Sequence, residues 1–287
     1  MSKTKENVFL VVTLAIFCLI LYYNSFGGIF IFDDAHSVVD NLFIKSPRYI
    51  PLFFKGHYTS EVDIPKGMFR PLLLLTFSFN YLFSRLQPLG YHIINTLFHF
   101  LNGIMLFCFL KLLHGGDASC IFKKPKCVSS QSQEALPFGL TLSITLLFLA
   151  HPLNTEAVCY LSSRSDLMVS FFILSGLICY FHRYFFLAFL AYLCGLLTKE
   201  TALVFPLLLF ALHLIFYRNT TPISKEARQR IIFFYIALAG ISIVYWLYRG
   251  MIFSPMAQEA GIAPIINPPR GIWPNILTQS AVTLFYL

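Results

Sequence analysis

The sequence predicts an all-α polytopic membrane protein whose helices cross the bilayer several times. Hydrophobic residues make up 57% and charged residues 12% of its 287 residues, and the mean hydropathy is +0.71. An average soluble domain carries about twice this share of charge. The 32 Phe and 15 Tyr also suit a lipid-facing protein, because Phe is tolerated in hydrocarbon and Tyr favours the membrane interface. These observations exclude a soluble fold.

The first apolar run, Val8–Tyr23, continues to Phe32 and predicts a first span over 8–32. Lys3 and Lys5 precede it as they would in a signal peptide, but no small-residue cleavage site follows, so we expect a retained anchor. A long polar loop is expected over 33–89, interrupted by the apolar stretch Met68–Phe83. Arginine and proline at the start of that stretch favour an interfacial helix over a complete span.

The rest of the chain alternates apolar runs with short polar turns. We expect one transmembrane domain over 1–287, a helical bundle with the interfacial helix in its first outer loop. Because the chain ends inside an apolar run, we expect this domain to be truncated at its carboxy terminus. After the first span, further spans are predicted at 90–113, 136–150, 167–181, 184–198, 201–217 and 231–248, and the start of another at 276–287.

The distribution of charge predicts which membrane face carries the chemistry. The short loop 218–230 holds four Lys or Arg, whereas the turn 151–166 holds one. Positive charge in short loops stays on the cytoplasmic side, so the first of these loops is predicted inside and the second outside. Nine of the 13 acidic residues then fall outside. Because carboxylates contribute little to orientation, this asymmetry indicates a functional outer face.

An adjacent acidic pair, Asp33 and Asp34, is predicted at the outer end of the first span. One carboxylate of such a pair can accept a proton from an attacking hydroxyl while the other orients the acceptor or holds a metal, so a divalent cation is left open. The alternative is that the pair only ends the helix and keeps the loop hydrated.

Basic side chains on the same face predict a phosphate site. Arg70, Arg164 and Lys199 could surround a phosphate, with arginine engaging two oxygens and lysine one. The alternatives are interfacial snorkelling and pairing with Asp166 and Glu200. Two further polar residues near the predicted outer turn, His151 and Glu156, complete the site candidates.

Four ordered motifs carry a family resemblance across about residues 30–210, namely FDDAHSVVDN, FRPLLLLTFSFNYLFSRLQPLGYHIINTLFHFLN, HPLNTEAVCYLSSRSDLM and LLTKETALVFPLLL. In these motifs the chain resembles the membrane domain of the transmembrane O-mannosyltransferases targeting cadherins (TMTC) and their bacterial relatives. It is more distantly similar to protein O-mannosyltransferases and the GT-C superfamily, which implies that the helical bundle over 1–287 is of the GT-C type. The tetratricopeptide repeats usual in that family would give a 34-residue period, which does not occur in this sequence.

The resemblance implies an inverting glycosyltransferase that takes a sugar from a polyprenyl or dolichyl phosphate donor at the lumenal or periplasmic face. It implies that Asp33 is the general base, with Asp34 as a neighbouring acid. His151 and Glu156 match its HPxxTEAV motif. The expected reaction moves a hexose such as mannose to a hydroxyl group. The acceptor is a protein, for example at Ser or Thr, or a lipid or glycan.

Two other function classes fit parts of the sequence. A transporter or lipid flippase would place its polar groups near mid-membrane in paired broken helices, whereas here they collect near one surface. A non-catalytic membrane scaffold would tolerate the loss of Asp33. For the favoured enzyme we expect the endoplasmic reticulum membrane or the bacterial inner membrane, with no nucleic-acid partner.

Overall fold

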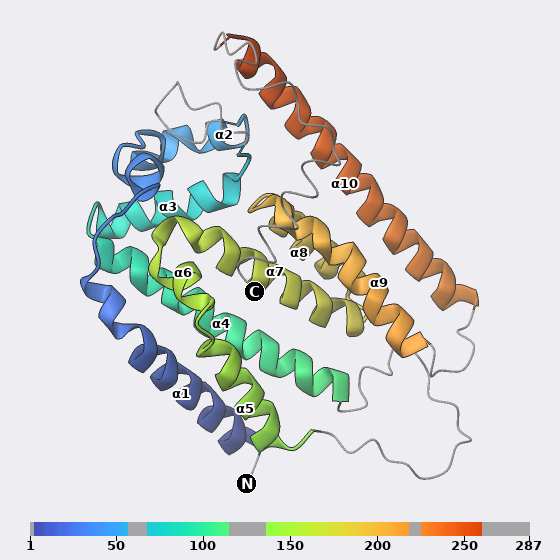
Figure 1. The fold of residues 1–287 in the computed structure, drawn as a ribbon. Helices are drawn as coiled ribbons and strands as arrows, with labels where there is room; N and C mark the ends of the chain where they lie inside the picture. The colour runs from blue at the N-terminus through green and yellow to red at the C-terminus, as the bar shows by residue number, and fades with distance from the viewer. Residues whose placement is uncertain (1–2, 57–67, 115–135, 218–224, 260–287) are drawn as a thin grey trace, which may run out of the picture.

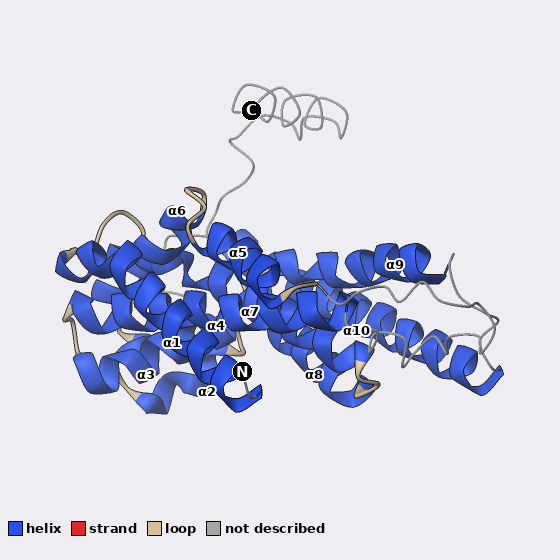
Figure 2. Cartoon of the chain, turned by 90° about the horizontal axis from the view of Figure 1, so that it is seen from below, coloured by secondary structure: helices blue, strands red, loops and turns tan. Residues whose placement is uncertain are grey.

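The computed structural model describes residues 3–56, 68–114, 136–217 and 225–259. Within these residues the chain is helical and contains no β-strand (Figure 2). The predicted start of a span at 276–287 lies outside the described residues. The helices are α1 (Lys3–Tyr22), α2 (Ile50–Phe53), α3 (Pro71–Ser84), α4 (Pro88–His114), α5 (Phe138–Leu149), α6 (Asn154–Cys159), α7 (Arg164–Phe181), α8 (Phe185–Leu196), α9 (Val204–Tyr217) and α10 (Lys225–Glu259).

The long helices run side by side, with α1 against α4, α4 against α7, α7 against α8, and α8 and α9 against α10 (Figure 1). Within the described residues, four segments are long and apolar enough to cross a membrane. They are Thr4–Gly27, Pro88–Leu113, Leu161–Phe181 and Lys225–Met251. The prediction of an all-α polytopic membrane protein is therefore confirmed.

Several predicted spans correspond to short helices. α5 and α8 each have 12 residues, which at 1.5 Å per residue gives about 18 Å, against a hydrocarbon core of about 30 Å. α3 has 14 residues and covers the stretch predicted as interfacial. The first helical segment ends at Gly27 rather than at Phe32, because Gly28 adopts an extended conformation and the chain then turns into the outer loop.

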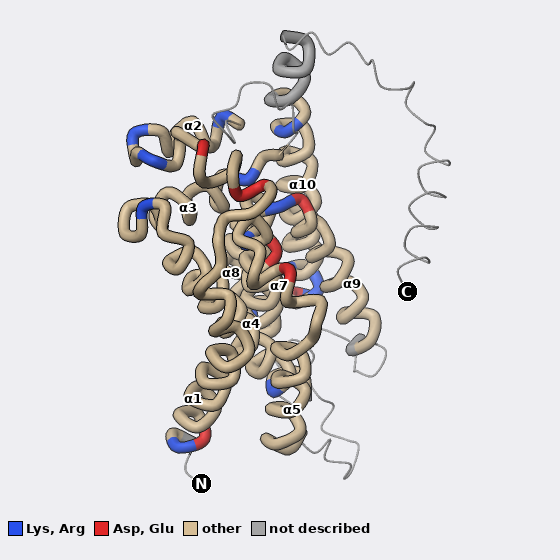
Figure 3. Tube along the Cα trace, turned by 60° about the vertical axis from the view of Figure 1, so that its left-hand side comes forward, with Lys and Arg blue, Asp and Glu red and all other residues tan. Residues whose placement is uncertain are grey.

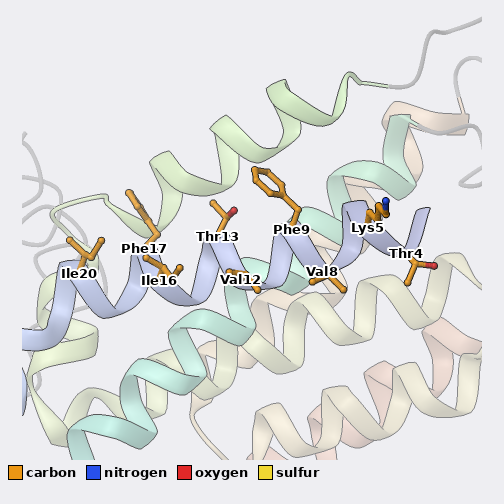
Figure 4. Close-up of a pocket in the computed structure, with 9 residues that line it drawn as sticks. All are labelled: Thr4, Lys5, Val8, Phe9, Val12, Thr13, Ile16, Phe17 and Ile20. Carbon is orange, nitrogen blue, oxygen red and sulfur yellow. The ribbon is translucent and has the colours of Figure 1, made fainter. Parts of the chain in front are cut away.

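The outward side of α1 shows how the bundle meets its surroundings. Figure 4 shows an apolar groove along this helix, with Val8, Val12, Ile16 and Ile20 along one edge. All four side chains are largely exposed, and their spacing of four residues places them on one helical face. An exposed apolar face of this length is expected where a helix borders lipid.

Among the described residues four buried hydrophobic clusters hold the helices together, and the three largest join most of them. One joins α1, α4 and α5 around Leu14, and a second joins α7, α8, α9 and α10 around Tyr192 and Phe205. The third cluster packs the outer loop and α3 onto α4 and α7, and includes Val38, Phe53, Leu73, Phe77 and Met168. This third cluster fixes the first outer loop at one end of the bundle. Figure 3 shows that most of the acidic residues lie toward that same end, where α2 and α3 are found.

Candidate functional site

A small polar cavity of about 90 Å³ lies at the end of the bundle that carries the outer loop. Four of the predicted site residues, Asp33, Arg70, Asp166 and Lys199, line it. They come from the loop after α1, the start of α3, the first turn of α7 and the segment after α8. The rest of its polar lining consists of Tyr160, His36, Ser37 and three serines of the segment 162–165. The fold thus brings together residues that are far apart in the sequence.

Asp33 presents its carboxylate to this cavity. Its side chain is 53% exposed, and Oδ1 lies 4.0 Å from Nδ1 of His36. The backbone N–H of Asp33 donates to the Tyr160 hydroxyl at 3.0 Å. The preceding Phe32 has φ of 47° and is almost fully exposed. A bulky residue in the left-handed region is strained, and such strain is found preferentially at functional sites.

Asp34 has a different environment from its neighbour, because it is completely buried. Its Oδ1 accepts the backbone N–H of Ser162 at 2.9 Å and the Ser162 hydroxyl at 2.6 Å. Its Oδ2 accepts the N–H of Ile31 at 3.1 Å. Asp34 therefore ties the outer loop to the start of the helical segment at Leu161, where the helix dipole also favours a carboxylate. Asp34 does not line the cavity.

Lys199 and Asp166, which both line the cavity, form an ion pair with Nζ 2.6 Å from Oδ1. Arg70 also lines the cavity, and one of its terminal nitrogens lies 3.8 Å from Glu200 Oε1. The start of α3 is held against the segment before Lys199, because the Leu72 N–H donates to the Leu197 carbonyl at 3.1 Å. This bond holds together the two segments that carry the basic side chains of the cavity.

Arg164 was predicted as a phosphate ligand, but the structure does not place it at the cavity. Its guanidinium is fully buried and stacks over the Phe77 ring, 4.7 Å from the centroid. Its donors are used inside the protein, with bonds to Asn95 Oδ1 (2.7 Å), Asn80 Oδ1 (2.8 Å), the Tyr91 carbonyl (3.1 Å) and Thr76 Oγ1 (3.4 Å). Arg164 therefore joins α3, α4 and α7 rather than facing a ligand.

One face of α4 supports the irregular backbone around the cavity. Asn95 donates to the carbonyls of Val158 and Tyr160, at 3.2 and 3.5 Å. His99 lies 3.1 Å from the Leu149 carbonyl, where α5 ends. Irregular backbone inside a membrane protein requires such internal partners, since lipid offers none. Asn95 thereby connects the buried Arg164 to the segment that carries Tyr160.

Two other predicted residues lie away from the cavity. His151 is exposed between α5 and α6, and Glu156 is exposed on α6. His151 Nδ1 accepts the Leu153 N–H at 3.3 Å. Neither lines the cavity. Among the residues that the structure describes, no three His, Cys, Asp or Glu side chains are grouped closely enough to hold a metal ion.

Sequence reasoning did not single out Tyr160 or Arg249. Tyr160 lies inside the HPLNTEAVCYLSSRSDLM motif, but an isolated tyrosine near an interface is usually a membrane anchor. Partial burial raises the pKa of its phenol, so the hydroxyl stays protonated at neutral pH. Arg249 follows the last predicted span by one residue and lies 3.9 Å from Glu200 Oε1. An arginine at the end of an apolar helix is usually read as snorkelling.

Comparison with known proteins agrees with the four motifs. The chain is 30% identical to human protein O-mannosyl-transferase TMTC3 over 163 residues, which are 55% of this chain and 15% of that protein. It is 28% identical to Drosophila melanogaster Tmtc3 over 184 residues, covering 62% and 20% of the two chains. Mouse TMTC4 is 30% identical over 164 residues, covering 55% and 21%.

The resemblance to the TMTC group of protein O-mannosyl-transferases is therefore confirmed. This chain spans about a fifth of the length of those relatives or less. No protein-family profile matches the chain. No solved structure matches it.

Proposed function

We propose that this chain is a GT-C-type inverting glycosyltransferase. It moves a hexose, in the first place mannose, from a polyprenyl or dolichyl phosphate to a hydroxyl of a protein acceptor. The reaction takes place at the lumenal or periplasmic face of the membrane. Three findings support the proposal: relatives named protein O-mannosyl-transferases, an all-helical membrane fold, and the polar cavity at one end of the bundle.

The observation that carries this proposal is the contrast between Asp33 and Asp34. Two adjacent carboxylates have opposite environments, one buried and hydrogen-bonded and the other half-exposed in a cavity with Arg70 and Lys199. A general base must reach the proton that it removes. Of the pair, only Asp33 offers its carboxylate to a molecule in the cavity.

The proposed reaction is a single displacement and has no covalent enzyme intermediate. The acceptor hydroxyl gives its proton to Asp33 while its oxygen forms a bond to the anomeric carbon of the sugar. The bond from that carbon to the phosphate oxygen breaks, and its electron pair leaves with the polyprenyl phosphate. Attack opposite the leaving group inverts the anomeric configuration. Basic side chains stabilise the charge that develops on the phosphate.

The test is the substitution Asp33→Asn in purified protein reconstituted into vesicles. Transfer of radiolabelled mannose from dolichyl phosphate mannose to a Ser/Thr peptide should fall by at least 100-fold, within the range of general base catalysis of roughly 10²–10⁴-fold. Asp40→Asn is the matched control, because Asp40 is an exposed carboxylate on the same loop that does not line the cavity.

Two results would contradict this proposal. One is transfer by Asp33→Asn at a rate close to that of the unmodified protein. The other is movement of the polyprenyl phosphate across the vesicle membrane without any sugar transfer, which would favour the transporter class.

A further inference from the structure

A groove of about 500 Å³ runs between α8 and α10, far from the cavity that contains Asp33. Five phenylalanines of the two helices and Ala237 form its apolar lining, and Gln229 and Arg230 are its polar residues. The rings of Phe185 on α8 and Phe234 on α10 pack with their centroids 5.5 Å apart, which joins the two helices. We call this feature the α8–α10 groove.

The α8–α10 groove is polar at one end and apolar at the other. Gln229, Phe233 and Ala237 follow one another at intervals of four residues, so they lie along one face of α10. At 1.5 Å per residue, Ala237 lies about 10 Å further along the helix than Arg230. The apolar part opens outward, since Phe186 and Phe233 are 76% and 74% exposed. A polar end followed by an open apolar channel matches the polarity of a phospholipid.

The polar end of this groove lies on the membrane side opposite the cavity. α8 begins at Phe185 in the groove, whereas Lys199, which follows the other end of α8, lines the cavity. Similarly, Tyr248 in the later part of α10 donates to the Phe54 carbonyl of the outer loop at 2.6 Å. The start of α10, which carries Arg230, is therefore at the end of the bundle where the loop 218–230 is predicted to be cytoplasmic.

Positive charge surrounds the polar end of the groove. The first residues of α10 include Lys225, Arg228 and Arg230 against the single acid Glu226, and Arg183 is exposed in the turn before α8. Only Arg230 of these lines the groove. It is exposed, and it belongs to none of the ion pairs in the part of the chain that the structure describes. The cytoplasmic leaflet is rich in anionic lipid, so this charge is complementary to it.

We propose that the α8–α10 groove binds one anionic phospholipid of the cytoplasmic leaflet. The headgroup phosphate accepts hydrogen bonds from the Arg230 guanidinium, whose paired N–H donors match phosphate oxygens, and from the Gln229 amide. One acyl chain lies between the phenylalanine rings and ends near Ala237, where the small side chain leaves room. Because the lipid contacts both α8 and α10, its binding stabilises the packing of these helices. This site is independent of the proposed function.

The experiment compares two lipids that differ only in the headgroup. The full chain in detergent is titrated with phosphatidylglycerol or with phosphatidylcholine of identical acyl chains, and bound lipid is counted by native mass spectrometry. Phosphatidylglycerol should bind more tightly. Arg230→Gln should raise its Kd about fivefold, as expected for one basic group at a lipid headgroup, and should leave the Kd of phosphatidylcholine unchanged. Arg228→Gln is the matched control, because Arg228 is exposed on the same helix outside the groove.

A second pair of variants tests where the acyl chain lies. Ala237→Leu fills the apolar part of the groove and should weaken the binding of both lipids, whereas Ala239→Leu, at an exposed position outside the groove, should weaken neither. If Ala237→Leu does not fold, Phe186→Ala decides in its place, because it removes one wall of the groove and should also weaken both lipids.

Three results would overturn the lipid site. The first is equal affinity of the unmodified chain for the two lipids, and the second is an equal effect of Arg230→Gln and Arg228→Gln. The third is a dimer in native mass spectra that disappears in Ala237→Leu, which would identify a second copy of the chain as the occupant of the groove.

Discussion

Replacing Asp34 by asparagine tests whether this residue supports the structure while Asp33 acts on the substrate. Asparagine keeps one acceptor oxygen for Ser162 but turns an NH₂ group toward the Ile31 N–H, which now donates to Oδ2 at 3.1 Å. Two donors then face each other in a buried site. A hydrogen bond to a charged group contributes about 1.5–3 kcal/mol, and an unpaired buried donor costs about 1–3 kcal/mol. We expect a loss of about 2.5–6 kcal/mol from these two effects together.

The assay is thermal unfolding in detergent with a thiol-reactive dye, whose signal rises above the level set by the exposed Cys108 when the buried Cys18 becomes accessible. For large single chains 1 kcal/mol shifts Tm by about 2–4 °C, so Asp34→Asn should lower Tm by roughly 5–24 °C. Asp33→Asn should change Tm by less than about 2 °C, because its carboxylate is half-exposed and makes only a 4.0 Å contact with His36. Equal Tm values for the two variants would refute the division of roles.

Two further substitutions test the packing that positions the cavity. In Gly28→Ala the new Cβ would lie 2.8 Å from both His92 Nε2 and the Ser25 carbonyl oxygen, so the same dye assay should show a loss of about 1–3 kcal/mol. Gly27→Ala, with nothing within 4 Å, is the control, and an equal effect there would contradict the steric explanation. Asn95→Leu leaves Arg164 Nε and the Val158 carbonyl without their partner. This substitution should lower the free energy of unfolding by about 3 kcal/mol or more. The protein should then lose its monodisperse peak in size-exclusion chromatography. A normal peak would contradict the role of Asn95 as a buried support.

The fold class could be predicted from composition, because a chain with so little charge has few alternatives to the bilayer. The grouping of Asp33, Arg70, Asp166 and Lys199 could also be anticipated, since topology alone places their segments on one face. The environment of each side chain, in contrast, could not be predicted from the sequence. Asp33 and Asp34 are neighbours with the same chemistry, and only the hydrogen bonds from Ser162, 128 residues away in the sequence, separate their roles.

The environment of Arg164 could not be predicted from the sequence either. An arginine between two predicted membrane segments is expected to face a ligand or to snorkel. It is instead buried among amide and carbonyl oxygens from α3 and α4. Nothing in the local sequence indicates this, because Asn80 and Asn95 lie 84 and 69 residues away in the sequence. These contacts depend on how α3 packs against α4. The spacing of residues within one segment does not determine that packing.

The polar residues of α4 explain how the candidate site is built at the edge of a membrane. Between α5 and α7 the chain breaks its helix twice, at 150–153 and at Tyr160, and each break frees backbone carbonyls that lipid cannot satisfy. At the first break, His99 forms a hydrogen bond with the Leu149 carbonyl. At the second break, Asn95 donates hydrogen bonds to the Val158 and Tyr160 carbonyls. The second break directs the Tyr160 hydroxyl to the Asp33 N–H and the Ser162 N–H to Asp34. The buried polar face of α4 is thus the support that lets an irregular segment present Asp33 to the cavity.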